Sequence, residues 1–258
     1  MIYNFEKTLI RSSCIAKIMT DPRTKKDKEA GKLSATTRSF LCSVYAWEKY
    51  GRKKDLQTKA IQKGLRVEED AITLISLLDK TMYVKNDIRL NNKWFTGEPD
   101  LFTEASIKKA IRVIDTKASW DLETFLPKLG TLLDKNYWWQ GQGYMDLTGA
   151  SEFEVSYCLV NTPQILIDDE KKKLFWKMGV ATEQNTDYVA ACEEMERTMI
   201  FDDIPAEERR IKFQINKDKD AIERARERVI RCREWLSEFQ EKHLSGGFVS
   251  EGGEGDDE

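Results

Sequence analysis

The stretch AIRVIDTKASW, residues 110–120, is an apolar run typical of a β-strand, yet it ends on Asp115 and Lys117. Side chains alternate between the two faces of a strand, so Asp115 and Lys117 point the same way, roughly 6–7 Å apart. A carboxylate at such a strand end is costly to desolvate unless it is paired or bound to a metal ion. This stretch therefore predicts a charged site at the edge of a β-sheet.

A second strand end that carries charge lies upstream, in WFTGEPDLF, residues 94–102, where Gly97 and Pro99 break the run and Asp100 follows. By itself, Gly-x-Pro-Asp is most often a turn. If the two runs are neighbouring strands, Asp100 supplies a second oxygen ligand beside Asp115. Two carboxylates and a lysine suit a hard divalent cation, Mg²⁺ or Mn²⁺. Such a cation binds a phosphoryl oxygen and acidifies water, while Lys117 orients that water or offsets negative charge.

Periodicity predicts the rest of an α/β fold, with a central mixed β-sheet flanked by helices and with helical additions at both ends. Helices are expected over 7–80 (with a lysine-rich loop between the first two), 121–133, 136–149, 164–179, 184–199 and 217–244, and strands over 82–117, 152–163 and 209–215. No linker is visible before residue 244. We therefore expect a single domain over 1–243 and a disordered acidic tail over 244–258.

Composition excludes several classes of protein. A hydrophobic content of 40% and a charged content of 34% describe a soluble globular chain. No apolar run approaches the roughly 20 residues that cross a bilayer, and Glu6 and Lys7 lie where a signal peptide needs its apolar core. The single histidine, His243, argues against Ser-His-Asp, Cys-His and histidine–metal chemistry. We therefore expect a cytoplasmic protein with no membrane partner, whose chemistry depends on carboxylates, lysines, tyrosines or a metal ion.

The five cysteines are scattered and form no CxxC pair, so neither a zinc site nor a disulfide framework is indicated, and buried free thiols are expected. The net charge of −3 is unevenly distributed, because residues 244–258 hold five of the 45 acidic residues and none of the 42 basic ones. Basic residues concentrate in 22–32 and 49–66. Such clusters fit phosphate contacts, although a solvated surface explains them equally well.

In this order, GEPD (97–100), VIDTKAS (113–119) and YWWQGQGYM (137–145) resemble the motifs of the PD-(D/E)xK nuclease superfamily. The resemblance is strongest to its branch of phage lambda-type exonucleases and RecB-like nucleases, which includes the YqaJ-like viral recombinases. GLRVEEDA (64–71) resembles the upstream helix of this branch, and IRSSCIAKIMTDP (10–22) is similar to its opening helix. The resemblance extends from about residue 9 to residue 163.

This resemblance implies a restriction-endonuclease-like core and a set of site residues. Metal ligands would be Glu68, Asp100, Asp115 and the carbonyl oxygen of Thr116; the catalytic set would be Glu68, Asp100, Asp115 and Lys117; DNA contacts would be Ser13, Gln140 and Tyr144. Gln140 and Tyr144 are four residues apart and so lie on one helix face. The chain departs from the family in having Asp115 where glutamate is commoner.

The implied function is a Mg²⁺-dependent (or Mn²⁺-dependent) exonuclease that hydrolyses duplex DNA from its ends in phage-type recombination or repair, in the host cytoplasm if the chain is phage-encoded. Relatives of the lambda type form rings of three subunits and work beside a single-strand annealing protein. The resemblance therefore implies a homotrimeric ring and a single-strand annealing partner. Two alternatives remain open at this point. One is a nuclease-fold DNA-binding or regulatory protein without catalysis, and the other is a structure-selective endonuclease.

Overall fold

The computed structural model describes residues 2–54, 58–83, 85–104 and 106–244. The larger of its two sheets has the strand order β4-β5-β6-β7. Its strands are β4 (Leu101–Phe102), β5 (Arg112–Ala118), β6 (Glu152–Cys158) and β7 (Arg210–Asn216). The two central strands, β5 and β6, are parallel, and each outer strand is antiparallel to its neighbour. The chain therefore needs a crossover between β5 and β6.

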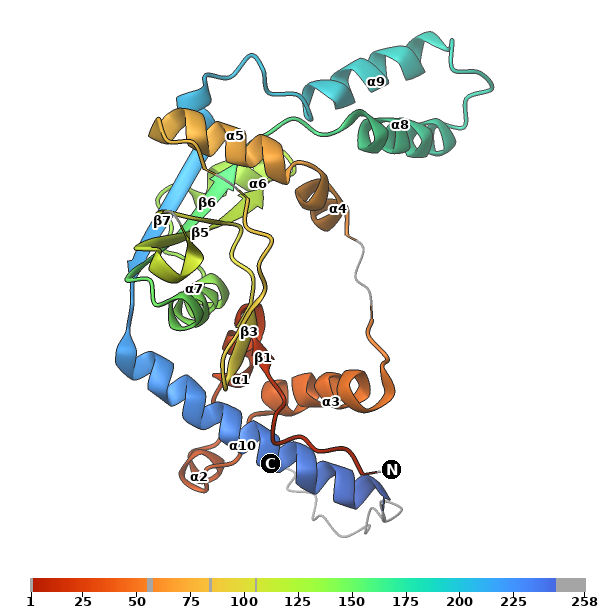
Figure 1. The fold of residues 1–258 in the computed structure, drawn as a ribbon. Coiled ribbons are helices and arrows are strands. Elements are labelled where there is room, and N and C mark those ends of the chain that lie inside the picture. Colours follow the sequence, from red (N-terminus) through yellow and green to blue (C-terminus); the bar gives the residue numbers. More distant parts are fainter. Residues whose placement is uncertain (1, 55–57, 84, 105, 245–258) are drawn as a thin grey trace.

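Helix α7 (Lys135–Thr148) provides most of that crossover and covers one face of the larger sheet (Figure 1). It begins where the side chain of Asp134 accepts a hydrogen bond from the amide of Asn136, and it ends at Gly149, whose φ of 86° is left-handed. Glycine adopts that conformation without strain. Two short helical turns, α6 (Leu122–Phe125) and η3 (Leu126–Lys128), precede it.

The opposite face of the sheet is covered by α5 (Glu68–Asp79), which follows α4 (Lys59–Arg66). Alternation along β5 separates the two layers. Val113 packs with Met145 of α7, whereas Ile114 packs with Ile75 of α5. Asp115 and Lys117 therefore emerge on the α7 side and Thr116 on the α5 side.

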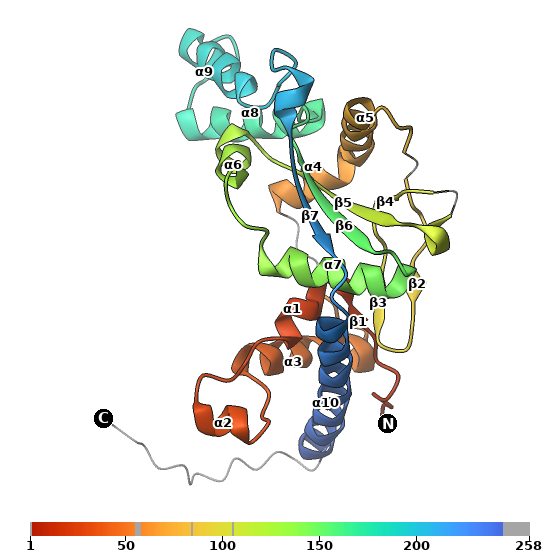
Figure 2. The same cartoon turned by 90° about the vertical axis from the view of Figure 1, so that its left-hand side faces the viewer.

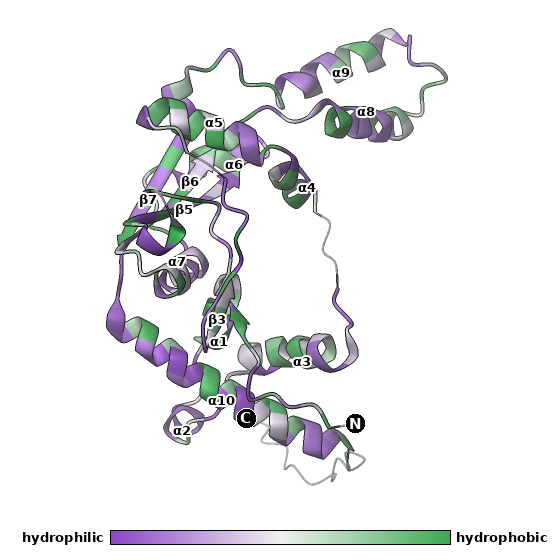
Figure 3. Cartoon of the chain, in the orientation of Figure 1, coloured by the Kyte–Doolittle hydropathy of each residue, from purple (hydrophilic) through white to green (hydrophobic). Residues whose placement is uncertain are grey.

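A second layer packs beneath the larger sheet. It contains a smaller sheet of order β1-β3-β2 and a helical cluster. The strands are β1 (Ile10–Arg11), β2 (Leu90–Asn91) and β3 (Phe95–Gly97), and the helices are α1 (Ile15–Ile18), α2 (Lys25–Glu29), α3 (Ala35–Tyr50) and α10 (Lys219–Leu244). Along α10, hydrophobic and hydrophilic segments alternate in Figure 3. Its apolar stripe, including Val229 and Leu236, packs with Leu41 of α3.

Two further helices, α8 (Gln164–Met178) and α9 (Thr186–Arg197), pair with each other. They project from the end of the larger sheet that lies away from α10 (Figure 2). A short turn, η4 (Ala206–Arg209), leads from them into β7.

These observations confirm the predicted α/β class, with sheets flanked by helices. Several local predictions were wrong. The two residues of β1 lie inside the region expected to be helical, α2 forms inside the expected lysine-rich loop, and 82–117 contributes strands to both sheets instead of one central sheet. The helix expected over 121–133 ends at Lys128. β1 exists because it pairs in parallel with β3, a contact that local periodicity does not reveal.

The cysteines agree only in part with the expectation of buried thiols. All five are free, but Cys42 is exposed and Cys14 is half-buried, whereas Cys158, Cys192 and Cys232 are buried. The acidic tail lies outside the described residues except for Leu244. Within the described ranges, no helix is both long and apolar enough to cross a membrane.

Replacing Gly141 with alanine should destabilise the fold. A Cβ atom at this position would lie 2.1 Å from Cδ1 of Phe153, so α7 would have to move off β6. We expect the free energy of unfolding in urea to fall by ~1–3 kcal/mol, the usual cost of overpacking a core. The matched control is Gly64→Ala in α4, where nothing lies within 4 Å of the new methyl group. There alanine should be neutral or stabilising by ~0.5–1 kcal/mol. Equal effects at both glycines would contradict this packing.

Candidate active site

The pairing of β4 with β5 brings the two charged strand ends together. Leu101 lies opposite Ile114, so Asp100, one residue earlier, reaches the end of β5. Its Oδ2 accepts hydrogen bonds from the backbone amide of Thr116 at 2.6 Å and from the Thr116 hydroxyl at 2.9 Å. One carboxylate oxygen of Asp100 is therefore fixed by the neighbouring strand.

Asp115 is 2% exposed and is contacted from two sides. Its Oδ1 accepts a hydrogen bond from Nε2 of Gln140 at 2.9 Å. Its Oδ2 forms an ion pair with the ammonium of Lys117 but accepts no hydrogen bond from any group in the described residues. Lys117 also donates to the carbonyl oxygen of Thr116 at 3.2 Å. The structure thus places Asp100, Asp115, Thr116 and Lys117 in one constellation.

Burial raises the pKa of Asp115 to about 6. The charge of Lys117 opposes this shift, and the negative charges of Asp100 and Glu68 add to it. Burial alone would lower the pKa of Lys117, but Asp115 and Asp100 outweigh burial and raise it. Lys117 is therefore a stable cation in this arrangement and a poor proton acceptor.

Gln140 and Tyr144 lie behind the carboxylates instead of facing solvent. Each is 6% exposed. Nε2 of Gln140 also donates to the hydroxyl of Tyr144 at 3.0 Å, and that hydroxyl donates to the carbonyl oxygen of Glu98 at 3.2 Å. Their burial fits a role in positioning Asp115 and the 97–100 segment better than the direct DNA contact expected from the resemblance.

The two serines of the opening segment differ in burial. Ser13 is exposed, whereas its neighbour Ser12 is buried and its hydroxyl donates to the carbonyl oxygen of Thr96 at 3.3 Å. A Cβ atom on Gly97 would lie 2.7 Å from the Ser12 hydroxyl and 2.7 Å from the ring of Tyr144. Ser12 and Gly97 therefore set how closely the smaller sheet approaches α7. The serine pair in the sequence is the only signal that indicated this contact, and it did not show which serine is buried.

Glu68 is the first residue of α5 and lies on the wall of the same cavity as Asp100 and Lys117. Its carboxylate forms an ion pair with Lys85 at 2.9 Å. Within the described residues, no three His, Cys, Asp or Glu side chains converge as a ready metal-binding group. Glu68 is thus adjacent to the carboxylate pair, held by a lysine that must shift before it can join the pair.

The cavity that contains these groups has a volume of about 570 Å³. Its walls come from α4, α5, the end of β5 and the start of α7, and they include Ile61, Gly64, Leu65, Glu68, Asp100, Thr116, Lys117, Trp120, Lys128, Tyr137 and Tyr157. Figure 1 shows α5 and α7 on opposite sides of β5, with α4 next to α5. The oxygens of Asp100, Asp115 and Thr116 match the ligand preference of a hard divalent cation. Oδ2 of Asp115, whose described partner is the Lys117 ammonium, is a further oxygen that could ligate such an ion.

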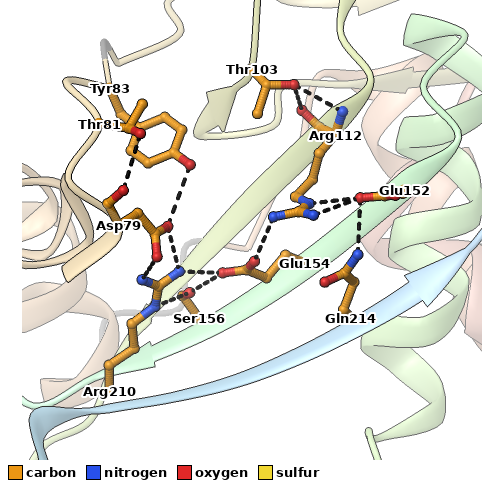
Figure 4. Close-up of polar contacts among 10 residues, drawn as sticks. All are labelled: Asp79, Thr81, Tyr83, Thr103, Arg112, Glu152, Glu154, Ser156, Arg210 and Gln214. Atoms are coloured by element: carbon orange, nitrogen blue, oxygen red, sulfur yellow. Dashed lines mark hydrogen bonds and ion pairs between the residues drawn. The ribbon is translucent and has the colours of Figure 1, made fainter. Parts of the chain in front are cut away.

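A buried network of charges anchors α5 and hence Glu68 (Figure 4). Asp79, the last residue of α5, receives two hydrogen bonds from Arg210 of β7, at 2.7 and 3.1 Å. Arg210 also contacts Glu154 of β6, which is 0% exposed. Arg112 of β5 extends the network to Glu154 and Glu152. Because α5 is rigid over about 17 Å, fixing Asp79 to the sheet also fixes the position of Glu68.

Lys63 is a site residue that the sequence did not indicate, since the KAIQKGLR segment reads as a solvated basic helix. Its side chain is fully buried, donates to the carbonyl oxygen of Trp120 at 3.0 Å and lies 5.1 Å from the ring centroid of Phe201. Trp120 lines the active-site cavity, so Lys63 connects α4 to the cavity wall opposite it. Burial lowers the pKa of Lys63 to about 8, although Asp121 opposes the shift.

Lys63 should give the chain a pH dependence of stability that Lys63→Met removes. Its pKa is about 8 when folded against an ordinary value of 10.5, so between these values the unfolded chain binds more protons and the free energy of unfolding rises with pH. The free energy of unfolding of both proteins is measured in urea between about pH 7 and about pH 10. Over this range we expect the unmodified protein to gain on the order of 1–2 kcal/mol of stability relative to Lys63→Met. If the difference in unfolding free energy between the two proteins does not vary with pH, the lowered pKa of buried Lys63 is contradicted.

The fold was compared with those of known proteins. No protein-family model and no curated protein matches the chain. Among solved structures, a phage-related exonuclease from Haemophilus somnus 129PT is 26% identical, with a TM-score of 0.70 and coverage of 93% of this chain and 98% of that chain. An alkaline exonuclease from Laribacter hongkongensis is 13% identical, with a TM-score of 0.60 and coverage of 93% and 95%. A complex of the Laribacter enzyme with dAMP has a TM-score of 0.59, 13% identity and coverage of 92% and 93%.

The similarity therefore extends over nearly the whole length of both the Haemophilus and the Laribacter proteins. It includes the region downstream of residue 163, which the motifs did not reach. The ordered motifs, the mixed sheet and the carboxylate–lysine constellation agree with it. The chain is similar over nearly its whole length to a phage-related exonuclease, which agrees with the resemblance of its motifs to the lambda-type and YqaJ-like branch of the PD-(D/E)xK nucleases.

Proposed function

We propose that this chain is a metal-dependent exonuclease that hydrolyses phosphodiester bonds from the ends of duplex DNA, in phage-type recombination or repair. The observation that carries the proposal is that Asp100 and cationic Lys117 line a cavity of about 570 Å³ while buried Asp115 pairs with Lys117 directly behind it. Exonucleases with the same fold support the choice of substrate, and one of them has been solved with dAMP.

Asp100, Asp115 and the carbonyl oxygen of Thr116 would hold Mg²⁺ or Mn²⁺, and Glu68 would join them once Lys85 releases it. When bound, such an ion supplies a Lewis acid for the phosphoryl oxygen and lowers the pKa of water. The hydrogen bonds from Thr116 hold Oδ2 of Asp100, and Gln140 holds Oδ1 of Asp115, while Oδ2 of Asp115 is paired with Lys117. An ion bound at Oδ2 of Asp115 would therefore share that oxygen with Lys117 or displace its ammonium.

Lys117 contributes positive charge at the reacting centre. Because its pKa is raised, it stays protonated and offsets the negative charge that develops on the phosphoryl oxygens, or donates a hydrogen bond to the attacking water. Electrostatic stabilisation of this kind suits phosphodiester hydrolysis, one of the slowest uncatalysed reactions. A ring of three subunits and a single-strand annealing partner remain predictions from the resemblance.

The decisive assay follows an end-labelled linear duplex with Mg²⁺, with chelator, and with Asp115→Asn. The amide substitution removes the ligating charge while keeping the shape of the side chain and the contact with Gln140. We expect digestion from the ends only by the unmodified protein with Mg²⁺, and a loss of at least about 100-fold in the variant, typical of losing a main electrostatic contribution.

A covalently closed circular duplex provides the control for mode of attack. An exonuclease leaves it intact, whereas an endonuclease would open it, and a binding protein without catalysis would leave linear DNA whole as well. Digestion of linear DNA by Asp115→Asn at the unmodified rate would overturn the site assignment.

A further inference from the structure

A second cavity, of about 450 Å³, lies between the smaller sheet, the N-terminal segment and the end of α3. It is lined by Tyr3, Asn4, Lys7, Thr8, Leu9, Arg11, Trp47, Glu48, Arg89 and Thr96, and we call it the Trp47 pocket. These residues come from the N-terminal segment, the end of α3, and the region around β2 and β3. No residue of the candidate active site lines it, so the two cavities are separate.

The Trp47 pocket combines cations with an aromatic face. Three basic side chains line it, Lys7, Arg11 and Arg89, against the single carboxylate of Glu48, which accepts a hydrogen bond from Tyr3 at 2.6 Å. The guanidinium carbon of Arg11 lies 4.2 Å from the ring centroid of Trp47. Aromatic faces beside basic side chains are how proteins hold single-stranded nucleic acid, since bases stack on the ring and phosphates contact the cations.

More cationic charge borders the pocket, and one polar group in its wall lacks a partner. The ammonium of Lys53 lies 5.2 Å from the same Trp47 ring. Thr8 is 5% exposed, and its hydroxyl makes no hydrogen bond to any group in the described residues. A buried hydroxyl without a partner is unfavourable.

The backbone links this pocket to the active site. Thr96 lines the Trp47 pocket and Asp100 lines the catalytic cavity, so four Cα–Cα steps separate the two walls, a span of at most ~14 Å. That span corresponds to about four nucleotides at ~3.4 Å each. Between them, Glu98 pairs with Arg89 at 2.9 Å, which fixes one of the three cations relative to the catalytic segment.

We infer that the Trp47 pocket is a subsite for the same DNA strand whose phosphodiester lies at Asp100 and Asp115, with a base packed against the Trp47–Arg11 pair and its phosphate held by the cations that line the pocket, Lys7, Arg11 and Arg89. This inference rests on the proposed function, because it assigns a substrate contact to a nuclease. It predicts that contact with the strand extends several nucleotides beyond the cleaved bond.

The test measures binding without turnover. In Asp115→Asn with chelator present, fluorescence anisotropy follows a labelled duplex bearing a single-stranded tail of about 12 nucleotides, a length within the range that one binding groove covers. Trp47→Ala should weaken binding about 10-fold with little change in salt dependence, and Trp47→Phe should retain most of the affinity because it keeps an aromatic face.

Arg11→Ala and the exposed Lys7→Ala should each lower the slope of log affinity against log salt by about 0.7, the value for one lost phosphate contact on a single strand. Lys93→Ala is the matched control, since Lys93 also lies over a tryptophan ring, Trp94, at 4.6 Å but does not line the pocket. Affinity and salt slope unchanged in the Trp47, Arg11 and Lys7 variants would overturn the subsite.

A second readout separates this inference from the proposed function. Hydrolysis of bis(p-nitrophenyl) phosphate with Mn²⁺, by protein that retains Asp115, needs only the metal site and should be unchanged by Trp47→Ala. A parallel loss of this small-substrate activity would mean that the substitution damages the fold, and it would overturn the subsite. If the variants lose DNA affinity while the unmodified protein degrades no DNA, the subsite stands and the nuclease proposal fails.

Discussion

The constraint on which the rest of the structure depends is a carboxylate buried on a central strand. Asp115 is 2% exposed, and burial disfavours its charged form. In the described residues its compensation comes from Lys117, two residues along the same strand, and from Gln140 of the crossover helix. Removing either contact would leave a buried charge incompletely solvated, which is strongly unfavourable. A fold that tolerates such a residue in its core has a use for the charge.

The larger architecture can be understood as support for that position. β4 delivers Asp100 to the end of β5. Helix α7 approaches closely enough for Gln140 to reach Asp115 because Gly141 faces β6 and Gly143 faces Ser12 and Ile15. On the other face, Arg210 fixes the end of α5 and so keeps Glu68 at the cavity wall. Each flanking layer therefore contributes one oxygen or one donor to the same edge of the sheet.

Much of this arrangement could be predicted because strands and helices impose fixed side-chain periods. The alternation in VIDTKAS placed Asp115 and Lys117 on one face, and the spacing of Gln140 and Tyr144 placed both on one side of a helix. What could not be predicted depends on contacts between distant segments. Gln140 and Tyr144 are buried instead of facing solvent, and Lys85 forms an ion pair with Glu68. Lys63 is buried although its local sequence is typical of a solvated helix.

The most direct test of the central claim is a calorimetric titration of metal-free protein with Mn²⁺, without DNA. If Asp100 and Asp115 are the ligands, the unmodified chain binds the ion and either Asp100→Asn or Asp115→Asn weakens binding by at least about 10-fold, since each removes a charged oxygen ligand. Lys85→Ala, which frees Glu68, should leave binding equal or stronger. Mn²⁺ binding of equal strength in the unmodified chain and both asparagine variants would contradict the account.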